Sequence, residues 1–83
     1  MPTIAEVVRE SLPPKYQGNP FLSELGVELA TASEQGKTTW DQYASIIVRH
    51  LTSLGLTESF VQEAARKVIP RLEGHGLIIV SNA

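Results

Sequence analysis

Residues 39–80 read TWDQYASIIVRHLTSLGLTESFVQEAARKVIPRLEGHGLIIV, and this stretch decides the fold. Its apolar residues recur every three or four positions on both sides of Gly55, which predicts two amphipathic helices joined by a tight glycine turn. The first helix begins at Thr39, and Gln42 three residues later completes a capping box. We expect Trp40, the only tryptophan of the chain, to anchor the core from the first turn of this helix.

The second helix of this stretch begins at Thr57 or Ser59, because both residue types cap helices well. Pro70 is expected to kink or end the helix, since proline removes a backbone donor. A Gly-His-Gly break follows at residues 74–76, and after it comes a continuous apolar run, Leu77-Ile78-Ile79-Val80. We expect this run to form a short strand, alone or paired with residues 37–39 in a small ribbon.

The first 36 residues predict helices that pack on this unit. Thr3 and Glu6 form a capping box that opens a helix over residues 3–12. Residues 13–19 then predict a loop, and Asn19-Pro20 begins a helix over residues 20–35. The expected fold is therefore mainly α. It is a single small helical domain of residues 1–83, with four helices and one short C-terminal strand.

Composition excludes several classes of function. A chain of 83 residues buries one modest core, and the absence of cysteine excludes disulfides, thiol nucleophiles and cysteine-based zinc sites. The net charge of −2 argues against strong nonspecific binding to nucleic acid. The charge is uneven, because residues 1–36 contain five acidic and two basic residues, whereas residues 37–83 contain four acidic and five basic residues. No apolar run approaches the roughly 20 residues of a membrane span and no signal pattern opens the chain, so we expect a cytoplasmic protein.

The glycine turn carries a family resemblance. Gly55 stands where a helix-turn-helix has its turn glycine, Leu54 and Leu56 flank it, and residues 66–78 are similar to the end of a winged-helix recognition helix that runs into its strand. Residues 37–80 thus resemble the helix-turn-helix, or winged-helix, superfamily, without a second strand or wing. The resemblance implies that the helix over residues 57–73 contacts DNA. The positions that would face the nucleic acid are Ser59, Gln62, Glu63, Arg66, Lys67 and Arg71.

The apolar run at residues 77–80 suggests a second kind of contact. A strand near a sheet edge has unpaired backbone groups on one side and invites a partner strand, from a second copy or from another protein. The predicted protein interface therefore consists of Leu77, Ile78, Ile79 and Val80. The alternative is that this run packs as a tail on the helices and belongs to the core.

No group of side chains predicts an enzyme. The serines have no nucleophile elbow around them, and His50 and His75 are too few and too far apart in sequence for a metal site. We expect no catalytic residue, metal, cofactor or small-molecule substrate. The leading hypothesis is a small non-catalytic protein that acts through protein–protein contact or as a homodimer. It would regulate or inhibit a larger cytoplasmic machine, as small phage- or mobile-element-encoded regulators do. The alternative is a sequence-specific DNA-binding transcriptional regulator that uses the helix over residues 57–73.

Overall fold

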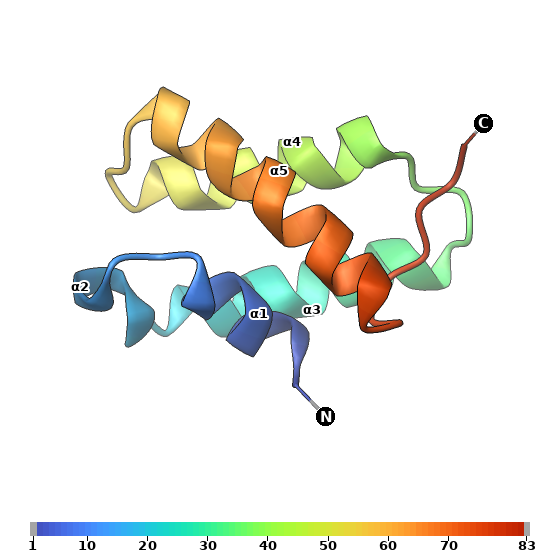
Figure 1. Cartoon of the computed structure of the whole chain (residues 1–83), viewed down its shortest axis with the longest axis horizontal. Helices are drawn as coiled ribbons and strands as arrows, with labels where there is room; N and C mark the ends of the chain where they lie inside the picture. Colours follow the sequence, from blue (N-terminus) through green and yellow to red (C-terminus); the bar gives the residue numbers. More distant parts are fainter. Residues whose placement is uncertain (1, 83) are drawn as a thin grey trace.

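The computed structural model describes residues 2–82, and this part of the chain is mainly helical, as predicted (Figure 1). Residues 2–82 contain five helices and no sheet. The helices are α1 (Ile4–Glu10), α2 (Pro14–Gln17), α3 (Phe21–Glu34), α4 (Trp40–Ser53) and α5 (Glu58–Gly74).

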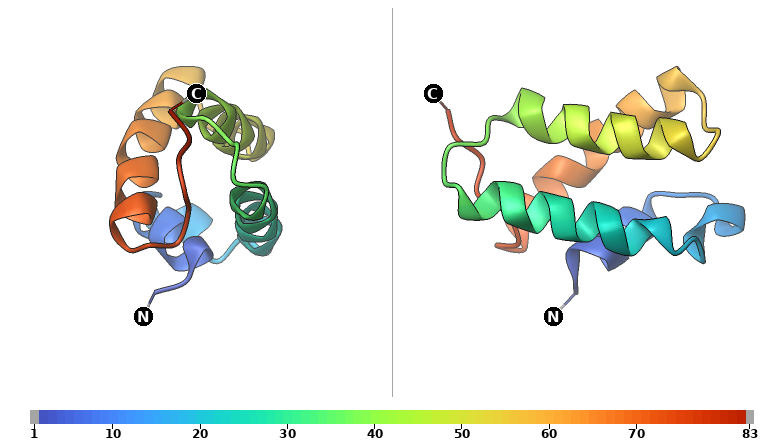
Figure 2. Two further views of the ribbon diagram at one scale, coloured as in Figure 1. Left: turned by 90° about the vertical axis from the view of Figure 1, so that its right-hand side faces the viewer. Right: turned by 180° about the vertical axis from the view of Figure 1, so that it is seen from behind.

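Four of these helices surround one core. Helix α1 packs on α3 and α5, and α4 packs on the same two helices from the other side, so that α3 and α5 lie diagonally across the ring (Figure 2). The short helix α2 packs beside α1. Most of the core consists of aliphatic side chains at helical spacing: Val7, Val8, Leu22, Leu25, Leu29, Ile47, Leu51, Val61, Val68, Ile69 and Leu72. Burial of these stripes is the main force that holds the ring together.

The helix ends follow the capping residues in the sequence. The hydroxyl of Thr3 accepts a hydrogen bond from the amide of Glu6, and Thr39 forms the complete capping box with Gln42. Thr57, rather than Ser59, caps α5. Both kinds of cap satisfy backbone donors that the first turn of a helix leaves without partners.

Gly36 and Gly55 follow α3 and α4 and have φ angles of 72° and 94°, and Gly55 lies where the sequence predicted a glycine turn. A residue with a Cβ is disfavoured in this left-handed region. The predicted glycine turn between α4 and α5 is therefore confirmed.

One local prediction is wrong, and another is contradicted in one of its two alternatives. Residues 13–19 do not form a loop throughout, because Pro14–Gln17 makes one helical turn with proline at its first position, where the missing backbone donor has no cost. Pro70 was expected to kink or end its helix, and the second alternative is excluded because α5 continues to Gly74. Pro70 is exposed, so water can reach the backbone carbonyl that loses its donor, while its neighbours Ile69 and Leu72 are buried and hold the helix on the core.

The predicted strand at residues 77–80 is not confirmed. The segment after α5 is extended and runs across the end of the ring toward the start of α4 (Figure 2), where it makes one isolated parallel bridge between Thr39 and Ser81. The amide of Ser81 donates to the carbonyl of Thr38 at 2.8 Å. A strand requires a ladder of such bonds with a neighbouring backbone. Here the amide of Leu77 turns back to the carbonyl of Leu72, and the backbone groups of Ile79 bond to side chains instead.

Those side chains come from α3 and α4. The hydroxyl of Tyr43 donates to the carbonyl of Ile79 at 2.8 Å, and the amide of Ile79 donates to the hydroxyl of Ser33 at 3.0 Å. The side chain of Ile78 enters the core and is 3% exposed, whereas that of Ile79 points outward and is 64% exposed. The tail therefore closes the core at one end of the ring.

Candidate functional site

A groove between α4 and α5 holds the only tryptophan of the chain. We call it the α4–α5 groove. Its volume is about 290 Å³, and its lining includes Trp40, Asp41, Ala44 and Val48 of α4 and Gln62 and Arg66 of α5. Trp40 is 38% exposed, so the prediction that it anchors the core is wrong. The groove is a hollow on the outside of the helical ring, and its floor includes the buried Ala65 of α5.

The spacing of residues on α4 explains why Trp40 faces outward. Trp40, Ala44 and Val48 are four residues apart and share one face of the helix. Tyr43 and Ile47 lie on the neighbouring face and are fully buried. The apolar stripe of α4 is thus wider than the surface that the other helices cover, and its uncovered edge forms one wall of the groove.

Two opposite charges stand on the two walls of the groove. Asp41 lies in the first turn of α4, and Arg66 lies on the exposed side of α5. Within residues 2–82, neither side chain makes an ion pair or a hydrogen bond, and they do not pair with each other. Both charges are therefore available to a molecule that enters the groove.

The residues predicted to contact nucleic acid all lie exposed on α5, but their surroundings differ. Gln62 and Arg66 line the α4–α5 groove, whereas Arg71 is paired with Glu10 of α1. The amide nitrogen of Gln62 donates to the carboxylate of Glu58 at 3.3 Å. The other three positions, Ser59, Glu63 and Lys67, are exposed without lining the groove.

The predicted protein interface at residues 77–80 divides between core and surface. Ile78 is buried, Leu77 and Val80 are half-buried, and only Ile79 exposes most of its side chain. Both backbone polar groups of Ile79 are already bonded to Tyr43 and Ser33. A partner strand would have to displace these bonds before it could pair with this segment.

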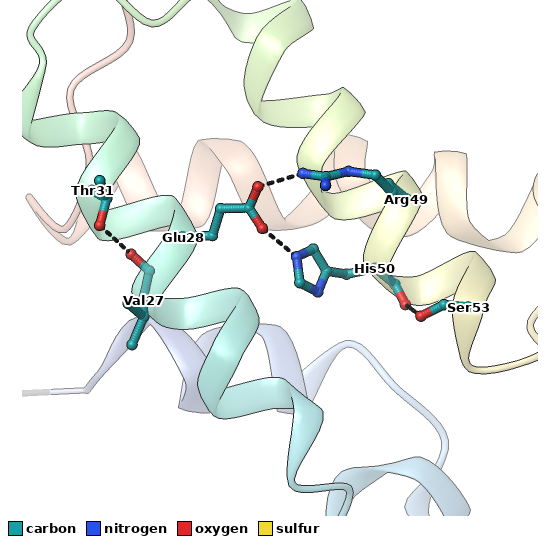
Figure 3. A network of polar contacts seen from close by, with 6 residues as sticks. All are labelled: Val27, Glu28, Thr31, Arg49, His50 and Ser53. Carbon is teal, nitrogen blue, oxygen red and sulfur yellow. Dashed lines mark hydrogen bonds and ion pairs between the residues drawn. The ribbon is translucent and has the colours of Figure 1, made fainter.

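A polar cluster joins α3 to α4 on another side of the molecule (Figure 3). The carboxylate of Glu28 receives a hydrogen bond from Arg49 through one oxygen and contacts Nε2 of His50 through the other. The hydrogen bond with His50, followed by that with Arg49, lowers the pKa of the Glu28 carboxyl below its ordinary value of 4.5. These contacts link residues more than twenty positions apart, and the sequence patterns did not predict them.

The described residues 2–82 contain no group of three or more metal-ligating acidic or histidine side chains. They also contain no helix with the length and apolar character needed to cross a bilayer. The site is thus characterised by an exposed aromatic ring, small apolar residues and two separate charges.

Comparison of the chain with protein-family models, with curated proteins and with solved structures finds no match. The resemblance of residues 37–80 to a helix-turn-helix therefore stays a prediction.

Proposed function

We propose that this chain is a non-catalytic protein-binding domain whose binding surface is the α4–α5 groove. The observation that supports this most strongly is the position of Trp40, whose large aromatic side chain is 38% exposed and lines the groove. Tryptophan and arginine are the residue types most enriched at the energetic centres of protein interfaces. The groove brings Trp40 and Arg66 together on one surface.

The open shape of the groove favours side chains of a protein over a free cofactor. Pockets for small molecules usually measure about 300–1,000 Å³ and enclose most of the ligand. The α4–α5 groove, at about 290 Å³, is at the lower end of this range, but it lies open between two helices and would not enclose a ligand. One or two apolar side chains from a partner would fill it, cover the ring of Trp40 and remove apolar surface from water.

The groove also suits a partner segment that is helical. Ala44 and Ala65 are small residues on the facing helices, and both contribute to the lining. Small side chains let a third helix approach two packed helices, which is the helix-in-groove mode of recognition. A role as a regulator or inhibitor of a larger cytoplasmic machine remains part of this proposal.

A displayed library of random peptides tests the proposal without knowledge of the natural partner. The immobilised wild-type chain, at low surface density, is compared with the variants Trp40→Ala and Phe21→Ala. Phe21 is the matched control, because it is 55% exposed on α3 and does not line the groove. We expect peptides enriched on the wild type to bind Phe21→Ala equally and to lose at least roughly tenfold in affinity for Trp40→Ala.

Equal binding of the enriched peptides to all three proteins would place the binding surface elsewhere. The absence of any enriched peptide would count against a protein-binding function. Circular dichroism on each variant verifies that its helices are intact.

DNA binding by α5 is the second candidate function. It is favoured by Arg66 and Lys67, which are adjacent, exposed and without an ion pair within residues 2–82. Against it, Glu58 and Glu63 are exposed on the same helix, and they would repel phosphate.

Lys67→Ala separates the two functions, because Lys67 does not line the groove. For a DNA-binding protein, this variant weakens the binding of a random-sequence duplex and reduces its dependence on salt. For a groove that binds protein, it leaves the enriched peptides bound as tightly as before. Fluorescence anisotropy at several salt concentrations measures both affinities.

A further inference from the structure

We infer that the molecule that fills the α4–α5 groove is a second copy of this chain. This inference rests on the proposed function and names the partner for it. It is carried by the charges of the groove, since Asp41 on one wall and Arg66 on the other have no ion-pair partner within residues 2–82. A surface with one unpaired charge of each sign is complementary to itself.

Two-fold symmetry converts this pattern into two ion pairs. In a symmetric dimer the same surface of each copy is used, so a residue that contacts another across the interface is contacted in return. An axis that lies in the plane of contact and passes between the two walls places Asp41 opposite Arg66 of the second copy. The same operation places Arg66 opposite Asp41 of that copy.

The apolar part of the groove lies beside these charges. Trp40 and Val48 belong to the same face of α4 as Ala44, so the same operation lays this apolar wall of each copy on α5 of the other copy. Each copy would then cover the exposed ring of the other's Trp40. Small residues at Ala44 and Ala65 allow the helices of the two copies to approach closely.

The length of the helices limits the strength of the dimer. Helix α4 has 14 residues, and at about 1.5 Å per residue it spans about 21 Å. A contact of two helix faces of this length falls toward the lower end of the range for stable interfaces, which bury about 1,200–2,000 Å² in total. We therefore expect an equilibrium between monomer and dimer that depends on protein concentration.

Charge reversal tests the inference directly. In Asp41→Arg all groove charges are positive, and in Arg66→Asp all are negative, so each variant alone opposes like charges twice in the dimer. Each like-charged contact is expected to raise the dissociation constant of the dimer by at least roughly tenfold. An equimolar mixture of the two variants pairs opposite charges again and is expected to form a heterodimer.

Light scattering coupled to size-exclusion chromatography, over a wide range of protein concentrations, measures each state. Glu24→Arg and Lys67→Asp are matched controls, because both reverse an exposed charge that does not line the groove. They should dimerise like the wild type.

A reversal at Asp41 also weakens its interaction with the dipole of α4, so folding is verified by circular dichroism. If a reversed variant does not fold, Asp41→Asn and Arg66→Gln replace the pair. Each neutral variant should weaken the dimer, and their effects should be less than additive in the double variant.

Three results would overturn the inference: a wild type that is monomeric at every concentration, a dimer insensitive to both reversals, or two monomeric variants that do not associate when mixed. The proposed function fails differently. A monomeric wild type whose enriched peptides still depend on Trp40 would refute the second copy as occupant and leave the groove as a binding surface for another protein.

Discussion

Ile78 and Ile79 are identical neighbours with opposite environments, and truncation of each to alanine tests how the tail is used. Ile78 is 3% exposed and Ile79 is 64% exposed. If the tail completes the core as the structure shows, Ile78→Ala should destabilise the fold strongly, and Ile79→Ala should have almost no effect.

The size of the effect follows from the carbon atoms removed. Isoleucine to alanine removes three carbon atoms, and at about 0.8 kcal/mol for each buried group of this kind the loss is about 2.4 kcal/mol. A cavity term adds to this value because surrounding side chains relax only in part. At Ile79, most of the side chain is already in water, so the change should remain within about 0.5 kcal/mol.

Urea unfolding followed by circular dichroism measures the free energy of unfolding of both variants, and thermal unfolding measures their melting temperatures. For a domain of this size, the expected loss at Ile78 lowers the melting temperature by at least roughly 10 °C. The dependence of the free energy of unfolding on urea should stay unchanged, since the denatured state is not altered. Equal effects at the two positions, or a loss below about 0.5 kcal/mol for Ile78→Ala, would refute the assignment of the tail to the core.

Three further predictions concern single positions. Gly26→Ala should stabilise the chain by about 0.5–1 kcal/mol in urea unfolding, because glycine is unfavourable inside a helix such as α3. The added Cβ would meet Ala5 of α1 no closer than 3.5 Å, which is an ordinary contact. A destabilised variant would show that α1 and α3 are packed too tightly for the added methyl group. Thr39→Ala removes the capping box of α4 and should cost about 1 kcal/mol by the same measurement, whereas an unchanged stability would mean that the cap has no energetic role. The lowered pKa of Glu28 implies a stabilising contribution that is present above the ordinary pKa of 4.5 and is lost as the pH falls through the lower pKa of the folded state. The stability difference between wild type and Glu28→Gln should therefore shrink on acidification, and a difference that is constant across this pH range would contradict the assignment.

The sequence predicted the parts of the fold that depend on local chemistry. The caps at Thr3 and Thr39 and the turn at Gly55 act within a few residues, so their sequence patterns are sufficient to place helix ends. Most of the apolar residues that recur at helical spacing are buried, with the exception of Trp40, because helical periodicity shows which residues share a face.

The candidate site could not be predicted in the same way. Trp40 and Tyr43 are both aromatic and both lie on the apolar side of α4, yet one lines the groove and the other is fully buried. The difference depends on where α5 packs and on the carbonyl of Ile79, which gives the hydroxyl of Tyr43 a partner 36 residues away. Such a long-range bond leaves no local pattern in the sequence.

The tail shows the same limit. Four apolar residues at positions 77–80 are typical of a strand, but a strand also requires a neighbouring backbone with free polar groups. In the folded chain, Ser33 and Tyr43 supply hydrogen bonds to this segment, and a single bridge joins it to Thr39. Tertiary contacts thus decided between strand and extended tail.

The fluorescence of Trp40 tests most directly whether the α4–α5 groove binds protein, because it is the only tryptophan and lies in the groove. A peptide enriched on the wild-type chain, chosen without tryptophan, is titrated into the protein while the emission spectrum is recorded. We predict a saturable shift of the emission to shorter wavelength as the ring leaves water. Saturable binding of the peptide, measured by anisotropy, without any change in the emission of Trp40 would contradict the groove as the binding site.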